Sequence, residues 1–120
     1  MNMRLDGEKL SLHPIQVAQW LDGQLSGPIY VEISPTNRCN HRCIFCACST
    51  VQGKNSISLG TMKDSISSLK LSGVRAIMYG GEGEPLLHPE IAEILDYTAS
   101  VGIDFSITTN GSMLDSVAAE

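Results

Sequence analysis

"IYVEISPTNRCNHRCIFCACST", residues 29–50, joins a strand-like alternation to every cysteine of the chain. In residues 29–36 apolar and polar side chains alternate, which predicts a β-strand. The loop that follows holds four cysteines, Cys39, Cys43, Cys46 and Cys48. In a chain of 120 residues with a formal net charge of −5, such a cluster suggests metal or redox chemistry rather than disulfides.

Two more strand–helix units follow this loop. The capping pair Thr61 and Asp64 predicts a helix from Thr61 to Gly73, and "VRAIMYGG" (74–81) predicts the second strand. A second helix is expected from Pro89 to Gly102, and a third strand over 103–111. Such alternation predicts a parallel sheet with right-handed crossovers. A third helix is expected to begin at Ser112.

Residues 1–28 are expected to form an extension with one short helix between Pro14 and Gly23. Trp20 would pack that helix onto the domain. Residues 29–120 would form the N-terminal half of a core domain, truncated before further strands. Met62 and Met78 are expected in its core.

The first and third strands each carry a polar row beside an apolar one. In a sheet covered by helices on both faces, strands are nearly continuous apolar runs. We therefore expect an α/β fold made of the first three units of a partial parallel βα barrel (TIM-like), whose concave side lines a polar cavity. Tyr30 and Glu32 are candidates for that cavity. An exposed sheet face is the alternative.

Composition limits the classes of partner. The negative net charge argues against nucleic acid and anionic membranes as main partners. The start of the chain has no apolar h-region, and no apolar run is long enough to span a bilayer. We therefore predict a cytoplasmic protein.

Three of the cysteines have the spacing C-x3-C-x2-C directly after a parallel strand. Cys39, Cys43 and Cys46 can hold three irons of a [4Fe–4S] cluster, because such clusters are bound through thiolates. The fourth iron then has no protein ligand, as in catalytic zinc sites where an open position serves chemistry.

This loop resembles the signature of the radical S-adenosylmethionine (radical SAM) superfamily. "CNHRCIFC" is similar to the family's C-x3-C-x-aromatic-C, with Phe45 at the aromatic position. "GGEGEP" (80–85) resembles the GGE motif after the second strand, and "TTNG" (108–111) resembles a sequence that closes the third strand in many members.

The resemblance implies a role for each matching residue. Cys39, Cys43 and Cys46 would ligate the cluster, and Phe45 would help place the adenine of SAM. The methionine amino group would be received by Gly80, Gly81 and Glu82. The ribose or carboxylate would be contacted by Ser106, Thr108 and Asn110.

The resemblance also implies an oxidoreductase that cleaves SAM reductively to a 5′-deoxyadenosyl radical, which abstracts hydrogen from an unidentified substrate. Its partners would include an electron donor of the flavodoxin or ferredoxin type and the missing C-terminal half of the barrel. The competing hypothesis is a non-catalytic module that binds an iron–sulfur cluster or zinc.

Several alternatives remain open for single residues. The three cysteines with Cys48 or His41 would also suit zinc. Cys43 and Cys46 alone would suit a redox dithiol, and Cys48 is either a packed thiol or a group near the substrate. Glu84 either touches SAM or substrate or is an exposed loop carboxylate. His88 is expected to cap or precede the second helix.

Overall fold

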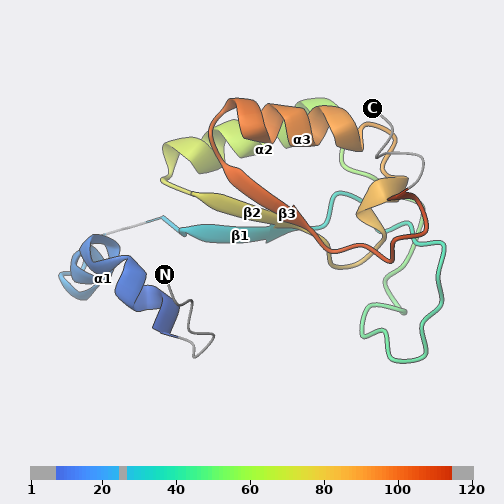
Figure 1. Ribbon diagram of the computed structural model, residues 1–120, viewed down its shortest axis with the longest axis horizontal. Helices are drawn as coiled ribbons and strands as arrows, with labels where there is room; N and C mark the ends of the chain where they lie inside the picture. The colour runs from blue at the N-terminus through green and yellow to red at the C-terminus, as the bar shows by residue number, and fades with distance from the viewer. Residues whose placement is uncertain (1–7, 25–26, 115–120) are drawn as a thin grey trace.

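The structure is a computed structural model that describes residues 8–24 and 27–114. Its strands and helices follow the alternation that the sequence predicts (Figure 1). The elements are η1 (Glu8–Leu12), α1 (Pro14–Leu21), β1 (Tyr30–Ile33), α2 (Leu59–Leu71), β2 (Ala76–Tyr79), η2 (Pro85–Leu87), α3 (Ile91–Ser100) and β3 (Asp104–Ile107). The expected third helix falls largely on residues 115–120, outside the described residues.

The three strands form one parallel sheet in the order β1-β2-β3. In the first register row Tyr30 lies beside Ala76, which lies beside Asp104. Helices α2 and α3 cover the same face of this sheet (Figure 1). Parallel strands with helices as crossovers confirm the predicted α/β class.

The hydrophobic core lies between the central strand and the two helices. Ile77 and Tyr79 of β2 pack with Met62 and Ile66 of α2 and with Ile94 of α3, and all five are buried. The Tyr79 hydroxyl lies 2.7 Å from Thr98 Oγ1, whose own proton goes to Ile94 O. The buried phenol therefore donates to Thr98, which leaves no unpaired polar atom in this part of the core.

Both helices begin at a different residue from the one predicted. Helix α2 begins at Leu59, because Ser58 is the N-cap and its Oγ accepts from the Thr61 amide at 3.2 Å. Helix α3 begins at Ile91 rather than Pro89. Buried His88 precedes it: Nε2 lies 2.7 Å from Ile57 O, and Nδ1 accepts from the Glu90 amide. His88 thus precedes the second helix, as expected.

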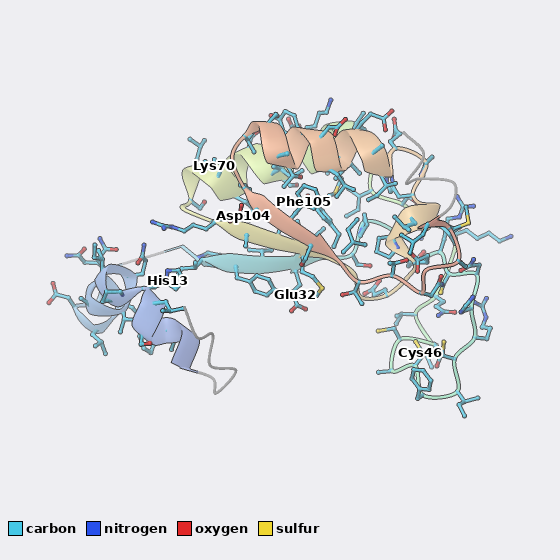
Figure 2. All side chains as sticks on the ribbon, viewed as in Figure 1. His13, Glu32, Cys46, Lys70, Asp104 and Phe105 are labelled. Carbon is cyan, nitrogen blue, oxygen red and sulfur yellow. The ribbon has the colours of Figure 1, made fainter. Side chains whose placement is uncertain are left out.

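The face of the sheet turned away from the helices carries the polar rows. Glu32 lies on this side (Figure 2), with Tyr30 beside it, and both are exposed. Register places Met78 between Glu32 and Ser106 on the same face. Met78 is therefore only partly buried and is not the core residue that was predicted, whereas Met62 is.

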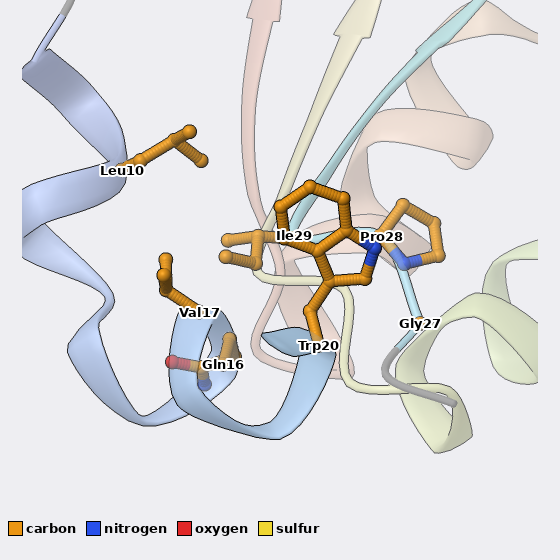
Figure 3. Close-up of a pocket in the computed structure, with 7 residues that line it drawn as sticks. All are labelled: Leu10, Gln16, Val17, Trp20, Gly27, Pro28 and Ile29. Atoms are coloured by element: carbon orange, nitrogen blue, oxygen red, sulfur yellow. The ribbon is translucent and has the colours of Figure 1, made fainter. Parts of the chain in front are cut away.

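The N-terminal helix lies at the amino end of β1, at the opposite end of the sheet from the cysteine loop (Figure 1). Helix α1 has no buried residue, and Trp20 is 68% exposed. The indole flanks an open groove beside Pro28 and Ile29 (Figure 3). The prediction that Trp20 packs its helix onto the domain is wrong, because most of the indole surface is exposed.

Across the described ranges, no helix has the length and apolar character needed to cross a membrane.

Candidate functional site

The cysteine loop is closed at its base by a hydrogen-bonded stem. Ile57 N donates to Pro35 O, Asn37 N donates to Asn55 O, and Gly53 N donates to Asn37 O. Buried Thr36 donates to Asn55 O at 2.9 Å and forms an isolated bridge with Ser56. The segment between these contacts therefore leaves and re-enters the fold at one point, beyond the carboxyl end of β1.

The four thiols lie on this closed loop. Cys39, Cys43, Cys46 and Cys48 are all free and partly exposed. Figure 2 shows Cys46 in the part of the loop that extends away from the sheet. Among the residues that the structure describes, no three His, Cys, Asp or Glu side chains are gathered as a metal site. The donor set nevertheless fits an iron–sulfur cluster, since three accessible thiols come from one short segment.

The second motif, GGEGEP (80–85), begins where β2 ends. Gly81 has a φ of +109°, a backbone conformation that residues other than glycine rarely adopt. The amide of Glu82 donates to Ser34 Oγ at 3.1 Å, which joins this loop to the end of β1. A Cβ on Gly80 would lie 3.1 Å from Thr108 Cβ. Glycine therefore lets the ends of β2 and β3 approach each other here.

Gly83 lies against the start of the cysteine loop. A Cβ at this position would lie 2.4 Å from both Thr36 O and Arg38 O, a distance that real contacts do not reach. The next amide, Glu84 N, donates to Arg38 O at 2.8 Å. The glycine motif and the cysteine loop are thus in backbone contact.

Glu84 is a buried carboxylate, not the exposed one offered as an alternative. Its side chain is 2% exposed. Oε1 accepts from Thr109 Oγ1 at 2.6 Å and from the Leu86 amide at 3.1 Å, and Oε2 accepts from the Asn110 amide at 2.7 Å. One side chain therefore joins the second motif to the third.

The third motif is joined to the cysteine loop by a set of amides and a hydroxyl. Asn110 Nδ2 donates to Asn40 Oδ1 at 2.9 Å, and Asn40 Nδ2 donates to Ser112 Oγ at 2.7 Å. Ser112 Oγ donates to Asn110 Oδ1 at 2.7 Å. Asn40 directly follows Cys39, so these three side chains join the TTNG motif to the beginning of the cysteine loop.

Polar groups on the open sheet face lead towards this edge. Tyr30 Oη donates to Glu32 Oε1 at 2.9 Å, and Thr108 Oγ1 donates to Met78 Sδ at 2.9 Å. Partial desolvation, together with the hydrogen bond to Glu32 and its charge, raises the pKa of Tyr30 above 10.0. The phenol therefore remains a proton donor at neutral pH.

Three segments far apart in sequence therefore meet at the carboxyl edge of the sheet, where ligands bind in α/β folds. A comparison of the sequence with protein-family models agrees with this arrangement. The model of the Radical SAM superfamily matches residues 33–120. The chain belongs to the radical SAM superfamily.

The curated relatives that match the chain include two enzymes. An S-adenosylmethionine-dependent nucleotide dehydratase of Selenomonas ruminantium is 40% identical over 85 residues, and a GTP 3',8-cyclase of Clostridium acetobutylicum is 36% identical over 96 residues. These matches cover 70% and 76% of the chain. The chain spans about 30% of the length of each relative.

Solved structures agree on the fold. Streptococcus suis SuiB bound to its precursor peptide SuiA matches 93% of the chain with a TM-score of 0.69 and 25% identity. SuiB bound to S-adenosylmethionine matches with a TM-score of 0.65. The chain corresponds to 26% of SuiB in each case. The predicted TIM-like radical SAM architecture is thereby confirmed.

The structure gathers some of the predicted radical SAM residues at the carboxyl edge of the sheet, but not all of them. Gly80, Gly81, Thr108 and Asn110 lie there, whereas Ser106 lies within β3 on the open face. Phe45 is 87% exposed on the loop, so it does not pack against the GGEGEP or TTNG motif.

Sequence reasoning missed the polar residues that join the three motifs. Asn40 was not singled out, Ser112 was predicted only to begin a third helix, and Glu84 was left between two roles. For Glu84 there was a local signal. A glutamate directly before Pro85 stands at the N-cap of a short turn, and its carboxylate does accept the Leu86 amide.

Proposed function

We propose that residues 29–120 form the cluster- and SAM-binding half of a radical SAM enzyme, with residues 1–28 as an extension. A bound [4Fe–4S] cluster would supply the electron for reductive cleavage of SAM to methionine and a 5′-deoxyadenosyl radical, which abstracts hydrogen from a substrate. The observation that carries this proposal is the meeting of the CNHRCIFC, GGEGEP and TTNG motifs at one sheet edge.

Cys39, Cys43 and Cys46 would hold the cluster. Their thiols are free and partly exposed on a loop whose stem is fixed. Cys48 is left without a role in this proposal, which makes it a useful internal control. Exposed Phe45, between two of the ligands, would cover the adenine of SAM.

The second and third motifs would hold the rest of SAM. Exposed Gly81 lets a ligand approach its backbone closely, and buried Gly80, packed against Thr108, would face the same amino group through its backbone. The exposed Glu82 carboxylate suits the methionine ammonium group. The ribose or carboxylate group of SAM would meet hydroxyls and amides. These groups belong to Ser106, Thr108 and Asn110.

A reductant must deliver the electron, and we propose a flavodoxin- or ferredoxin-type donor. We propose that a C-terminal half of the barrel completes the site and contacts the substrate, in keeping with matches that cover about 30% of each relative. Four free thiols suit a reducing compartment such as the cytoplasm.

Electron paramagnetic resonance tests the proposal on the anaerobically reconstituted chain reduced with dithionite. We expect a reduced [4Fe–4S] signal that changes when SAM is added. Cys39→Ala, Cys43→Ala and Cys46→Ala should each lose the cluster, because no replacement thiolate lies at the same position. Cys48→Ala, on the same loop, is the matched control and should keep it.

Three results would count against this function. Stoichiometric zinc with no cluster would favour a structural metal site, and loss of the cluster in Cys48→Ala as well would indicate a different ligand set. A cluster signal indifferent to SAM would support the alternative of a cluster-binding module.

A further inference from the structure

The buried carboxylate of Glu84 has no place in the ligand set described above, yet it touches two of the three motifs. A carboxylate accepts hydrogen bonds and donates none, so it suits a position where every neighbour is a donor. Its three neighbours are the Thr109 hydroxyl and the amides of Leu86 and Asn110. Among the described residues, these contacts leave no buried side-chain polar atom unpaired.

The backbone of the same residue touches the remaining motif. Glu84 N donates to Arg38 O, one residue before the first cysteine. From Asn110 a second route leads to the loop, through Asn40. A buried polar group that is fully satisfied rigidifies its surroundings, and a partly satisfied one destabilises them. Glu84 therefore stands where the geometry of all three motifs is fixed together.

We propose that Glu84 is a positioning residue: its carboxylate fixes the TTNG turn and, through Asn110 and Asn40, the first part of the cysteine loop. Glu84 itself does not contact SAM or the cluster. It acts by holding Asn110 and the loop where, on the function proposed above, SAM and the cluster would bind.

Glu84→Gln is the sharpest variant because it keeps the shape of the side chain. A carboxamide presents one oxygen and one NH₂ group, so at least one of the three donors then faces another donor. Whichever backbone amide then faces the NH₂ group, that of Asn110 or that of Leu86, should exchange its hydrogen at least about tenfold faster, as measured by NMR. The backbone order parameters of Cys39 and Asn40 should fall, while amide exchange at Ile66 and Ile77 stays unchanged.

Two further variants separate positioning from general destabilisation. Glu93→Gln makes the same chemical change at an exposed position of α3 and should alter none of these signals. Asn40→Ala removes an exposed side chain, so it should fold normally. It should loosen the cysteine loop but leave exchange of the Asn110 amide, bonded to Glu84, nearly unchanged.

SAM affinity gives an independent measurement on the reconstituted chain. Glu84→Gln should bind SAM at least about tenfold more weakly at equal iron content. The proposal is overturned if exchange at either the Asn110 or the Leu86 amide accelerates without any change at Cys39 and Asn40, or if SAM affinity is unchanged. Should the unsubstituted chain bind no SAM, the proposed function of the chain fails, whereas the NMR comparison still decides the role of Glu84.

Discussion

Gly83 lies where the backbone of the GGEGEP loop packs directly against the start of the cysteine loop. The carbonyl oxygens of Thr36 and Arg38 occupy the space that a Cβ would need. Neither oxygen belongs to a flexible side chain, so neither can move unless the stem of the cysteine loop opens.

Gly83→Ala should therefore lower the free energy of unfolding by about 1–3 kcal/mol, the usual cost of overpacking. It should also loosen the cysteine loop. Gly60→Ala is the matched control: a Cβ there meets nothing within 4 Å, and Gly60 lies inside α2. Since alanine favours helix, this control should raise stability by up to about 1 kcal/mol. Urea unfolding of both variants measures the two effects, and equal stabilities would show that the loops are not in contact.

For single residues, the sequence predicted the positions of the motifs but not which of their side chains are buried. Cysteine spacing and the glycines carry local signals, so the positions of all three motifs were predicted. Burial of Glu84 depends on where the third motif arrives, some 25 residues later in the chain. A pattern within one loop does not contain that information.

The serines of α2 illustrate how one residue type has opposite effects within one element. Ser58 caps the helix by accepting the Thr61 amide, which would otherwise have no partner in the helix. Inside the helix, the exposed Ser68 donates to the carbonyl of Asp64, a bond that competes with helical geometry.

We expect the same substitution to have opposite signs at these two positions. Ser58→Ala should reduce the free energy of unfolding by about 1 kcal/mol. Ser68→Ala should increase it by a few tenths of a kcal/mol, since alanine is the better helix former. Thermal unfolding followed by circular dichroism compares them directly. A loss in both variants would mean that Ser68 contributes to packing rather than only facing solvent.

At the element scale, the existence and type of the strands and helices were predicted better than their ends. The alternation in β1 and the stripe of Met62 and Ile66 in α2 are strong periodic signals. Thr61 fits a capping pattern in the sequence, but the structure places the N-cap at Ser58, whose Oγ accepts from the Thr61 amide. Periodicity predicts an element, whereas side-chain contacts set its first residue.

For the whole molecule, the N-terminal extension and the sheet are separate in their packing. Helix α1 buries no residue, and the core is formed by β2, α2, α3 and their neighbours. The stability of the sheet should therefore depend little on the extension.

A chain that begins at Gly27 should keep its thermal midpoint within about 5 °C of the full chain. Ile66→Ala is the contrasting control, since it empties a fully buried position and should cost about 2–5 kcal/mol. Calorimetry on both proteins tests this. A drop on truncation as large as that of Ile66→Ala would show that the exposed Trp20 helix contributes to the core after all.

The sequence predicted the α/β class and the parallel sheet of the whole molecule, because alternating strands and helices allow few topologies. It did not predict the exposure of Trp20. An apolar stripe on a short helix indicates that the helix packs somewhere, but not against which surface.

The closed stem of the cysteine loop has a consequence for chain entropy. Bringing together the ends of a free segment of about fifteen residues costs about 2 kcal/mol of conformational entropy. Here the pairing of Pro35 and Asn37 with Ile57 and Asn55 incurs that cost during folding of the domain. Three thiols on a segment with fixed ends then search a much smaller volume for a common centre than they would in a detached peptide. The sheet thus lowers the entropic cost of assembling the ligands although it contributes none of the donor atoms.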